Sequence, residues 1–366
     1  MKNKVCLVTL VPAHYRCLIY KLLEKELGCS YLFGDMNPTI KRISADALKD
    51  TINIESRIIP GTPFYWLKNV LKNTKGKNVI IDDMGIFCLT SWVNILLAKL
   101  RRQKIYMWSH GWYGREGFVK KWIKRAYSAM SDGMFLYGEY AKNLMIKNGF
   151  NPDKLHVIHN SLDYDTQLNI RKKTQKSDIY KAHFRNNYPV LVFIGRLTNS
   201  KRIDMIVEAI AEMKKEGHLF NLVLIGDGEA KSAIEQQIKD LKVEDSVWLY
   251  GACYDEGENA ELLYNADLCV SPGNVGLTAI HAMMFGTPVI THNDFPYQGP
   301  EFEAIKSGVT GDFFSKGDVD SMKMVIIKWF KEHENREAVR MSCYSEIDEN
   351  WNPHIQVRII SNVING

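Results

Sequence analysis

Two glycine-containing segments, far apart in the chain, carry residue types suited to binding phosphate. The first is Gly195-Arg196-Leu197, with Lys201 four residues further on, in the run VFIGRLTNSKRID. The second is the run SPGNVGLTAIHAMMFGTPVI, from Ser271 to Ile290. Each follows a strand-like apolar stretch and leads into a helix-like one, where free backbone N–H groups attract anions. Because Arg196 and Lys201 add fixed positive charge, we expect an enzyme that handles a nucleotide-linked substrate.

The elements that must position these motifs alternate between strand-like and helix-like patterns along the whole chain. The predicted strands cover 5–10, 30–33, 78–81, 105–108, 134–137, 156–159, 189–194, 221–225, 247–250, 268–271 and 288–291. The predicted helices cover 15–27, 86–100, 118–130, 203–215, 230–241, 259–265, 276–285, 319–333 and 355–364. This alternation predicts an α/β fold with two doubly wound parallel sheets, whose ligands bind at the carboxyl ends of the strands.

A length of 366 residues suits two domains rather than one core. We predict a first domain over 1–165 and a second over 189–350. The polar and basic segment 166–188 has few core residues, so we predict that it is the crossing between the domains. We expect a final helix in 351–366 that returns to the first domain.

Composition places the chain among ordinary globular proteins. Apolar residues make up 46%, but no run approaches the roughly 20 apolar residues that a membrane-spanning helix needs. The N-terminal run MKNKVCLVTLVPAHYR has a short apolar stretch and no cleavage site of small residues, so we interpret it as a first buried strand. Seven cysteines without metal-type spacing favour reduced thiols and a cytoplasmic location.

The segment from Lys99 to Arg125 is strongly basic, with nine basic residues against the single acid Glu116. Within it, Phe118 to Met130 has the pattern of an amphipathic helix. Its predicted apolar face holds Val119, Trp122, Ile123, Ala126, Tyr127 and Met130, and its basic face holds Lys120, Lys121, Lys124 and Arg125. Two interpretations stay open: a surface helix packed on its own domain with a solvated basic face, or peripheral contact with an anionic membrane. No nucleic-acid recognition module is present in the sequence.

The motifs of the second half resemble, in order and spacing, the nucleotide-sugar domain of the family 4 retaining glycosyltransferases. They are FIGRL with the following lysine over 193–201, LIGDGE over 224–229, YNADL over 264–268, GLTAI over 276–280, and AM with GTPVI over 282–290. The resemblance covers about half the chain. It implies the GT-B architecture, two facing Rossmann-like domains with a cleft between them. It also implies a nucleoside-diphosphate sugar as donor substrate, with no metal and no further cofactor.

The resemblance assigns roles to the two phosphate-binding segments. Arg196 and Lys201 would clamp the donor diphosphate and stabilise it as it leaves; the alternative is that they form ordinary ion pairs. The backbone of Val275, Gly276 and Leu277 would hold the distal phosphate and the sugar. Gly195 and Gly276 would be glycines because the ligand must approach the backbone closely, and Gly226 would also bind substrate. The base would lie along residues 250–253.

One departure from the family pattern concerns its pair of glutamates, since Gly273 and His281 stand at those positions. Glycine has no side chain to position the transferred sugar, whereas a neutral histidine still hydrogen-bonds a hydroxyl. We therefore assign His281 to the ribose, the alternative being a helix histidine satisfied by other residues. Glu301, close downstream, is the candidate to take over part of the missing carboxylate's role.

The first half carries fewer family features. His110, directly after a predicted strand, corresponds to the family's histidine beside the sugar, which would orient it; the alternative is a structural histidine. Asn160 opens a turn similar to the family's asparagine–glycine–x–aspartate turn and would bind substrate. Arg16 would either reach acceptor or phosphate, or cap the first helix. The adjacent pair Asp82-Asp83 does not predict a metal site, because neighbouring side chains on an extended strand point apart.

These observations favour a retaining transferase that moves a sugar to a glycan acceptor, lipid-linked, in surface polysaccharide or O-antigen-type assembly. Its location would be cytoplasmic, with peripheral contact at the inner face of the membrane. Two alternatives remain: a sugar-nucleotide 2-epimerase of the same architecture, and a catalytically silent nucleotide-sugar-binding subunit. The sequence does not specify the sugar, the base or the acceptor.

Overall fold

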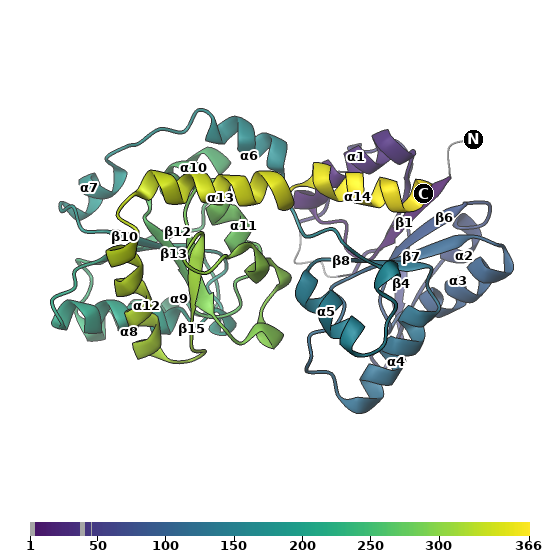
Figure 1. Ribbon diagram of the computed structural model, residues 1–366, viewed down its shortest axis with the longest axis horizontal. Coiled ribbons are helices and arrows are strands. Elements are labelled where there is room, and N and C mark those ends of the chain that lie inside the picture. The colour runs from purple at the N-terminus through teal and green to yellow at the C-terminus, as the bar shows by residue number, and fades with distance from the viewer. Residues whose placement is uncertain (1–3, 37–40, 45) are drawn as a thin grey trace. The chain divides into compact units, whose positions relative to one another are not determined.

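A computed structural model describes residues 4–36, 41–44 and 46–366 of the chain (Figure 1). The chain forms two compact units, one of residues 1–163 with 352–366 and one of residues 164–351. Each is a parallel β-sheet covered by helices, so the predicted α/β class with two doubly wound sheets is confirmed.

The first unit contains a seven-stranded parallel sheet in the order β3-β2-β1-β6-β7-β8-β9 and a separate two-stranded antiparallel sheet, β4-β5. Its strands are β1 (Val5–Thr9), β2 (Ser30–Phe33), β3 (Thr51–Asn53), β4 (Ser56–Ile58), β5 (Tyr65–Leu67), β6 (Val79–Asp83), β7 (Lys104–Ser109), β8 (Gly133–Leu136) and β9 (Leu155–Val157). Its helices are α1 (Cys17–Leu27), α2 (Val70–Asn73), α3 (Leu89–Leu100), α4 (Phe118–Ala129), α5 (Glu139–Lys147) and α14 (Pro353–Asn365).

Alternate side chains of the first sheet enter two separate cores, as the period of two along a strand requires. On β1, Val5 and Leu7 belong to the core that includes α1 and α14, whereas Cys6 and Val8 belong to the core on the opposite face. The last helix, α14, thus contributes to the first unit's core. It is also tied to the end of β9, because the Gln356 side chain donates to the carbonyl of His159 at 2.6 Å.

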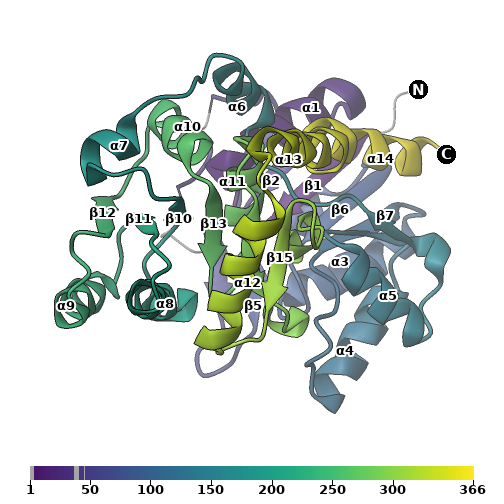
Figure 2. The ribbon, with the colours of Figure 1, turned by 60° about the vertical axis from the view of Figure 1, so that its left-hand side comes forward.

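The second unit contains a six-stranded parallel sheet in the order β12-β11-β10-β13-β14-β15. Its strands are β10 (Val190–Ile194), β11 (Asn221–Ile225), β12 (Val247–Gly251), β13 (Leu268–Ser271), β14 (Val289–His292) and β15 (Gly311–Phe314). Its helices are α6 (Tyr164–Arg171), α7 (Ile179–Phe184), α8 (Ile203–Lys215), α9 (Lys231–Leu241), α10 (Glu256–Asn265), α11 (Thr278–Met284), α12 (Val319–Glu332) and α13 (Arg336–Asn350). Figure 2 shows α12 alongside β15 at one edge of this unit.

The segment 166–188, which we expected to be a crossing between domains, instead contributes two helices to the second unit. Helix α6 is held to α13 by an ion pair between Arg171 and Asp348 at 2.8 Å. Helix α7 buries Tyr180, whose hydroxyl donates to the carbonyl of Leu262 at 2.5 Å. Polar side chains such as Arg171 and Gln167 anchor α6, so the segment lacks the apolar periodicity of a packed helix and its sequence resembles a linker.

Helix α4 forms where the pattern predicts it, but most of its predicted apolar face is exposed to solvent. Of the predicted apolar face, only Tyr127 is buried and Met130 partly buried, while Val119, Trp122, Ile123 and Ala126 are exposed. The inner face is fixed instead by Lys124, whose ammonium donates to the Gly111 carbonyl at 3.0 Å and lies 2.8 Å from Glu116. Helix α4 is thus packed on its own unit through Tyr127 and Ser128, and Lys120 and Arg125 of its basic face are exposed, so this interpretation agrees with the structure except for the exposed apolar residues.

Candidate functional site

The predicted donor motifs of the second unit converge where its strand order reverses. From β10 the chain builds outward to β11 and β12, and then returns to place β13 on the other side of β10. In doubly wound sheets, such a switch point opens a crevice at the carboxyl ends of its two strands. Gly195 and Arg196 directly follow β10, and Gly273 lies two residues after β13. The sheet thus brings the two motifs, which are far apart in the sequence, close together in space.

Gly273 sits against the backbone of the other motif. Its amide donates to the carbonyl of Lys201 at 3.0 Å, and a Cβ at this position would lie 2.2 Å from the carbonyl oxygen of Ser200. No side chain fits there without moving the Asn199–Lys201 turn. The glutamate that the family carries at this position is therefore excluded by packing in this chain.

Gly226 has a packing role that the sequence did not reveal. A Cβ on Gly226 would lie 1.8 Å from the carbonyl oxygen of Gly195, so the two loops after β10 and β11 touch at these glycines. The Gly195 amide in turn donates to the carbonyl of Ile225 at 2.9 Å. Gly226 therefore keeps the loop of Gly195 close to the sheet, and its predicted contact with substrate stays a prediction.

Two cations lie at this switch point with little compensation. Arg196 is exposed, and it forms no ion pair within the part of the chain that the structure describes. Lys201 is partly buried, and its ammonium donates to the carbonyl of Asn274. Burial lowers the pKa of Lys201, Glu301 opposes this shift, and Arg196 adds to it. A bound anion would relieve the repulsion between these cations.

Glu301 is buried beside the same loop, with 4% of its surface exposed. Its Oε2 lies 2.6 Å from the position that a Cβ on Gly299 would take, and that position is 3.1 Å from the Cα of Gly276. The carboxylate proposed to replace the missing glutamate is thus adjacent to the predicted sugar-binding backbone.

The three predicted backbone donors before α11 are not equivalent. The Val275 amide already donates to the Gln298 side chain at 2.9 Å, and Gln298 itself is held by the Thr291 hydroxyl and the His292 carbonyl. The amides of Gly276 and Leu277 donate to no partner in the described residues. Helix α11 starts only at Thr278, later than we predicted. The Val275 amide therefore stabilises the loop, whereas the amides of Gly276 and Leu277 remain available to a ligand.

His281 is engaged by an acid that the sequence reasoning missed. Its Nε2 lies 2.8 Å from Oε1 of Glu256, which also accepts from Gln167 at 2.7 Å. Burial alone would raise the pKa of Glu256, but these hydrogen bonds and the His281 charge lower it overall. This geometry matches the alternative of a histidine satisfied by other residues, and the ribose role stays a prediction. Glu256 begins α10, and no sequence spacing links it to α11.

In the first unit, the corresponding switch point lies between β1 and β6 and is filled by side chains. Arg16 lies 3.6 Å from the carboxylate of Asp83 at the end of β6, and the Thr9 hydroxyl donates to that carboxylate at 2.9 Å. Arg16 also donates to the Tyr137 hydroxyl and lies over the ring of Trp108. The pKa of Arg16 is raised, since its aromatic and acidic neighbours outweigh its burial. Arg16 occupies the N-cap position of α1, as the capping alternative expects, but its side chain makes no capping hydrogen bond.

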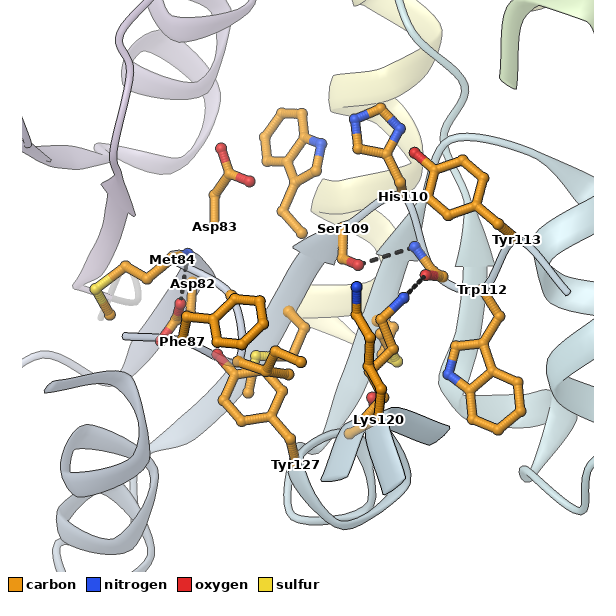
Figure 3. A pocket seen from close by; sticks show the side chains of 18 residues that line it. Asp82, Asp83, Met84, Phe87, Ser109, His110, Trp112, Tyr113, Lys120 and Tyr127 are labelled. Atoms are coloured by element: carbon orange, nitrogen blue, oxygen red, sulfur yellow. Dashed lines mark hydrogen bonds between the residues drawn. The ribbon is translucent and has the colours of Figure 1, made fainter. Parts of the chain in front are cut away.

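A cavity of about 300 Å³ lies beside this ion pair in the first unit (Figure 3). Asp83 points away from Asp82, whose carboxylate accepts from Ser91 at 2.6 Å. The pair thus diverges, as the extended strand predicts, and no metal-binding group of His, Cys, Asp or Glu occurs among the described residues. The wall is aromatic and basic, built mainly by Phe87, Trp112, Tyr113, Lys120, Lys124 and Tyr127.

His110 stands at the rim of this cavity, where its strand ends. Its ring lies 4.7 Å from that of Tyr137 and stacks at 6.1 Å with that of Tyr113. Although the residue is exposed, the surrounding protein hinders hydration of a charged ring. This desolvation, together with the charges of Arg16 and Lys124, lowers the pKa of His110 to about 4. The imidazole is therefore neutral near pH 7 and is able both to donate and to accept a hydrogen bond.

Asn160 is buried near the C-terminal helix of the first unit. Its Oδ1 accepts from the amide of Ser161 at 3.0 Å, and the Ser161 hydroxyl bonds Gln356 of α14. The turn therefore connects β9 to α14. Its predicted contact with substrate stays a prediction.

The comparisons with known proteins agree with this architecture. Residues 175–344 match the model of the family described as glycosyl transferases group 1. The chain is 15% identical to Anabaena HepE, solved in complex with UDP, with 99% of each chain covered and a TM-score of 0.73. It is 14% identical to the lipopolysaccharide outer core galactosyltransferase WaaB, again over 99% of each chain, with a TM-score of 0.74. The fold is therefore the two-domain GT-B fold of Rossmann-like domains.

Curated relatives match mostly over the second unit. The amylovoran biosynthesis glycosyltransferase AmsK of Erwinia amylovora is 23% identical over 185 residues, which are 48% of this chain and 44% of that protein. The poly(glycerol-phosphate) alpha-glucosyltransferase of Bacillus subtilis is 24% identical over 321 residues, 81% of this chain and 44% of that protein. The chain thus spans less than half the length of these relatives.

Proposed function

We propose that the chain is a retaining glycosyltransferase. It moves a hexose-type sugar from a nucleoside-diphosphate donor to a lipid-linked glycan, in the assembly of a surface polysaccharide or O-antigen-type glycan. The cytoplasmic side of the membrane supplies the acceptor. The family match over residues 175–344 supports the transferase class, since it includes every donor motif of the second unit.

The observation that carries the proposal is the pair of weakly compensated cations at the second unit's switch point. Arg196 and Lys201 lie where a doubly wound sheet binds its ligand, next to the open amides of Gly276 and Leu277. A diphosphate would supply the missing negative charge. Because HepE was solved with UDP and with UDP-glucose, uridine-linked sugars are the first donors to test.

In the proposed reaction, the bond between the sugar's C1 and the diphosphate oxygen breaks. The acceptor oxygen forms the new bond to C1 on the same face, and the acceptor's proton passes to the departing phosphate oxygen. Arg196 and Lys201 neutralise the charge that grows on that phosphate. His110 orients the sugar by hydrogen bonding and accepts no proton, as its lowered pKa favours a neutral ring. Glu301 contributes the carboxylate that Gly273 cannot.

Thermal melting with UDP, GDP, ADP, CMP and their sugar conjugates tests donor binding. A ligand that binds only the folded state raises the melting temperature with its concentration. We expect UDP to produce such a shift. If none of these nucleotides raised the melting temperature, the donor assignment would be contradicted.

Product analysis then separates the candidate activities. NMR of the anomeric proton in the product tests retention of configuration. Release of an epimerised free sugar nucleotide would instead indicate a 2-epimerase. Binding without transfer or slow hydrolysis would indicate a catalytically silent subunit, for which the loss of the glutamate at Gly273 is the supporting observation.

A further inference from the structure

Helix α4 presents an apolar surface to solvent, which is unusual for a helix of a globular domain. The exposed fractions are 76% for Phe118, 69% for Val119, 59% for Trp122 and 40% for Ile123. With Ala126, these positions share one face of the helix. Both ribbon views show α4 at the outer edge of the first unit (Figures 1 and 2).

Uncompensated positive charge borders this apolar face. Lys121 and Arg125 form no ion pair within the described residues: Lys121 lies over the ring of Trp112, and Arg125 donates to the carbonyl of Asn148. The only acid of the surrounding segment, Glu116, is already paired with Lys124. A partner that fits the surface must therefore be apolar in the middle and anionic around it.

We infer that α4 docks on the surface of an anionic lipid bilayer, with Phe118, Val119, Trp122 and Ile123 inserted at the boundary between headgroups and acyl chains. Aromatic and aliphatic side chains flanked by lysine and arginine are the pattern of a helix that lies in the membrane interface. The described residues contain no helix long and apolar enough to cross a membrane, so docking is peripheral.

Charge argues against a second copy of the chain as the occupant. A two-fold interface would place the same patch on both partners, and the cations around one apolar face would then meet those around the other. An anionic bilayer instead attracts each of them, and each basic residue near such a surface strengthens binding about fivefold.

Docking by α4 would also place the cavity of the first unit at the membrane. The opposite face of α4 contributes Lys120, Lys124 and Tyr127 to the cavity wall, and Figure 3 shows Lys120 pointing toward the cavity. Since a helix with its side chains is about 10 Å across, the cavity would lie roughly one helix diameter from the bilayer. This deepens the proposed function, because a lipid-linked acceptor would reach the cavity without leaving the membrane surface.

Vesicle flotation of the full chain tests the inference without donor or acceptor, so its failure and the failure of the transferase proposal are distinguishable. We expect binding to vesicles of phosphatidylcholine with phosphatidylglycerol, and much weaker binding to phosphatidylcholine alone. Phe118→Ser/Trp122→Ser should weaken binding at least about tenfold, since each aromatic residue loses several buried carbons. The matched control is Met324→Ser/Met341→Ser on the second unit, where both residues are more than 60% exposed.

A second variant tests the charge contribution. Lys121→Gln/Arg125→Gln should weaken binding to anionic vesicles and reduce its dependence on salt, while the UDP-induced thermal shift is retained as evidence of folding. Vesicle binding unchanged in both double variants, or absent in the wild type, would overturn the inference. Sedimentation as a dimer that Phe118→Ser/Trp122→Ser abolishes would overturn it in favour of a second copy.

Discussion

The two sheets reverse their strand order in the same way, yet the two switch points differ in how charge is compensated. In the first unit, the guanidinium of Arg16 lies 3.6 Å from Asp83 and donates to Tyr137. In the second, Arg196 is exposed and has no ion pair in the described part of the chain. The first switch point is therefore filled by its own side chains, whereas the second leaves the guanidinium of Arg196 available to a ligand.

Glycine allows the close packing of the loops at the second switch point. Gly226 and Gly273 leave no room for a Cβ, and they let three loops approach within backbone contact distance. In the first unit, the loop after β1 instead holds Pro12 and Ala13. The same fold thus separates roles by side-chain volume: small residues let the loops of the second unit pack together, and a partly buried ion pair links the start of α1 to β6 in the first unit.

The largest effect should follow from removing the uncompensated charge. Arg196→Ala should reduce sugar transfer roughly 100- to 1000-fold, since one preorganised contact to the departing charge is lost. It should also reduce the UDP-induced thermal shift, with little change in melting temperature of the unliganded protein. Steady-state kinetics with a UDP-sugar and thermal melting measure both.

Arg202→Ala is the matched control for this change. Arg202 is six residues away and exposed, and it is paired with Asp204 at 2.8 Å, so its removal should cost little. Equal losses in Arg196→Ala and Arg202→Ala would mean that the lack of an ion pair at Arg196 does not determine donor binding. The contrast between the two switch points would then fail.

Breaking the ion pair of the first unit should affect stability instead of donor binding. Arg16→Met leaves Asp83 without its cation, and we expect a loss of about 3 kcal/mol in the free energy of unfolding. Urea denaturation measures this change. Arg57→Met provides the control, because its pair with Glu55 is more than half exposed and should contribute less than about 1 kcal/mol.

A double substitution at this ion pair tests whether the stability loss comes from the unpaired carboxylate. Arg16→Met/Asp83→Asn should recover part of the lost stability, since the uncompensated carboxylate is removed. The UDP-induced shift should persist in both variants. Loss of that shift at unchanged stability would show that Arg16 binds the donor, against the structural role assigned here.

A smaller effect is expected at the glycine of the second crevice. Gly273→Ala forces the Asn199–Lys201 turn away from β13, and we expect a loss of about 2 kcal/mol in stability with weaker UDP binding. Gly117→Ala is the control, because a Cβ there would meet no atom within 4 Å and the φ of −63° at this position suits alanine. If Gly273→Ala bound UDP as tightly as the wild type, the close packing would not be what positions Lys201.

The sequence predicted most strands correctly because strands of this kind depend on local patterns. Runs such as 190–194 and 221–225 are wholly apolar, as strands buried on both faces must be. The short strands β3, β4 and β5 were missed because three residues carry too little periodicity. Edge strand β15 was missed because Gly311 and Asp312 break the apolar pattern.

Sequence patterns do not predict contacts between residues that are far apart in the chain. The spacing of Lys120, Lys124 and Tyr127 defines one face of a helix, but it does not say which face is inward. That choice depends on Glu116, a buried acid that anchors Lys124. In the same way, Glu256 and His281 meet only because α10 and α11 pack together, so the engagement of His281 had no signal in its neighbours.

The smallest predicted effect concerns the charge of His110 as the pH falls. Desolvation by the surrounding protein and the cations Arg16 and Lys124 lower its pKa to about 4, so the unfolded chain binds this proton at higher pH than the folded one. Stability should therefore decrease between about pH 6.5 and pH 4, and this part of the decrease should be absent in His110→Gln. NMR of ¹³C-labelled histidine rings in both proteins identifies the His110 signal, which should remain that of a neutral ring until about pH 4. A His110 signal that titrates near pH 6.5 would mean that Asp83 and solvent compensate the two cations more fully than the geometry implies. The first switch point would then resemble the second in leaving its charge open to a ligand.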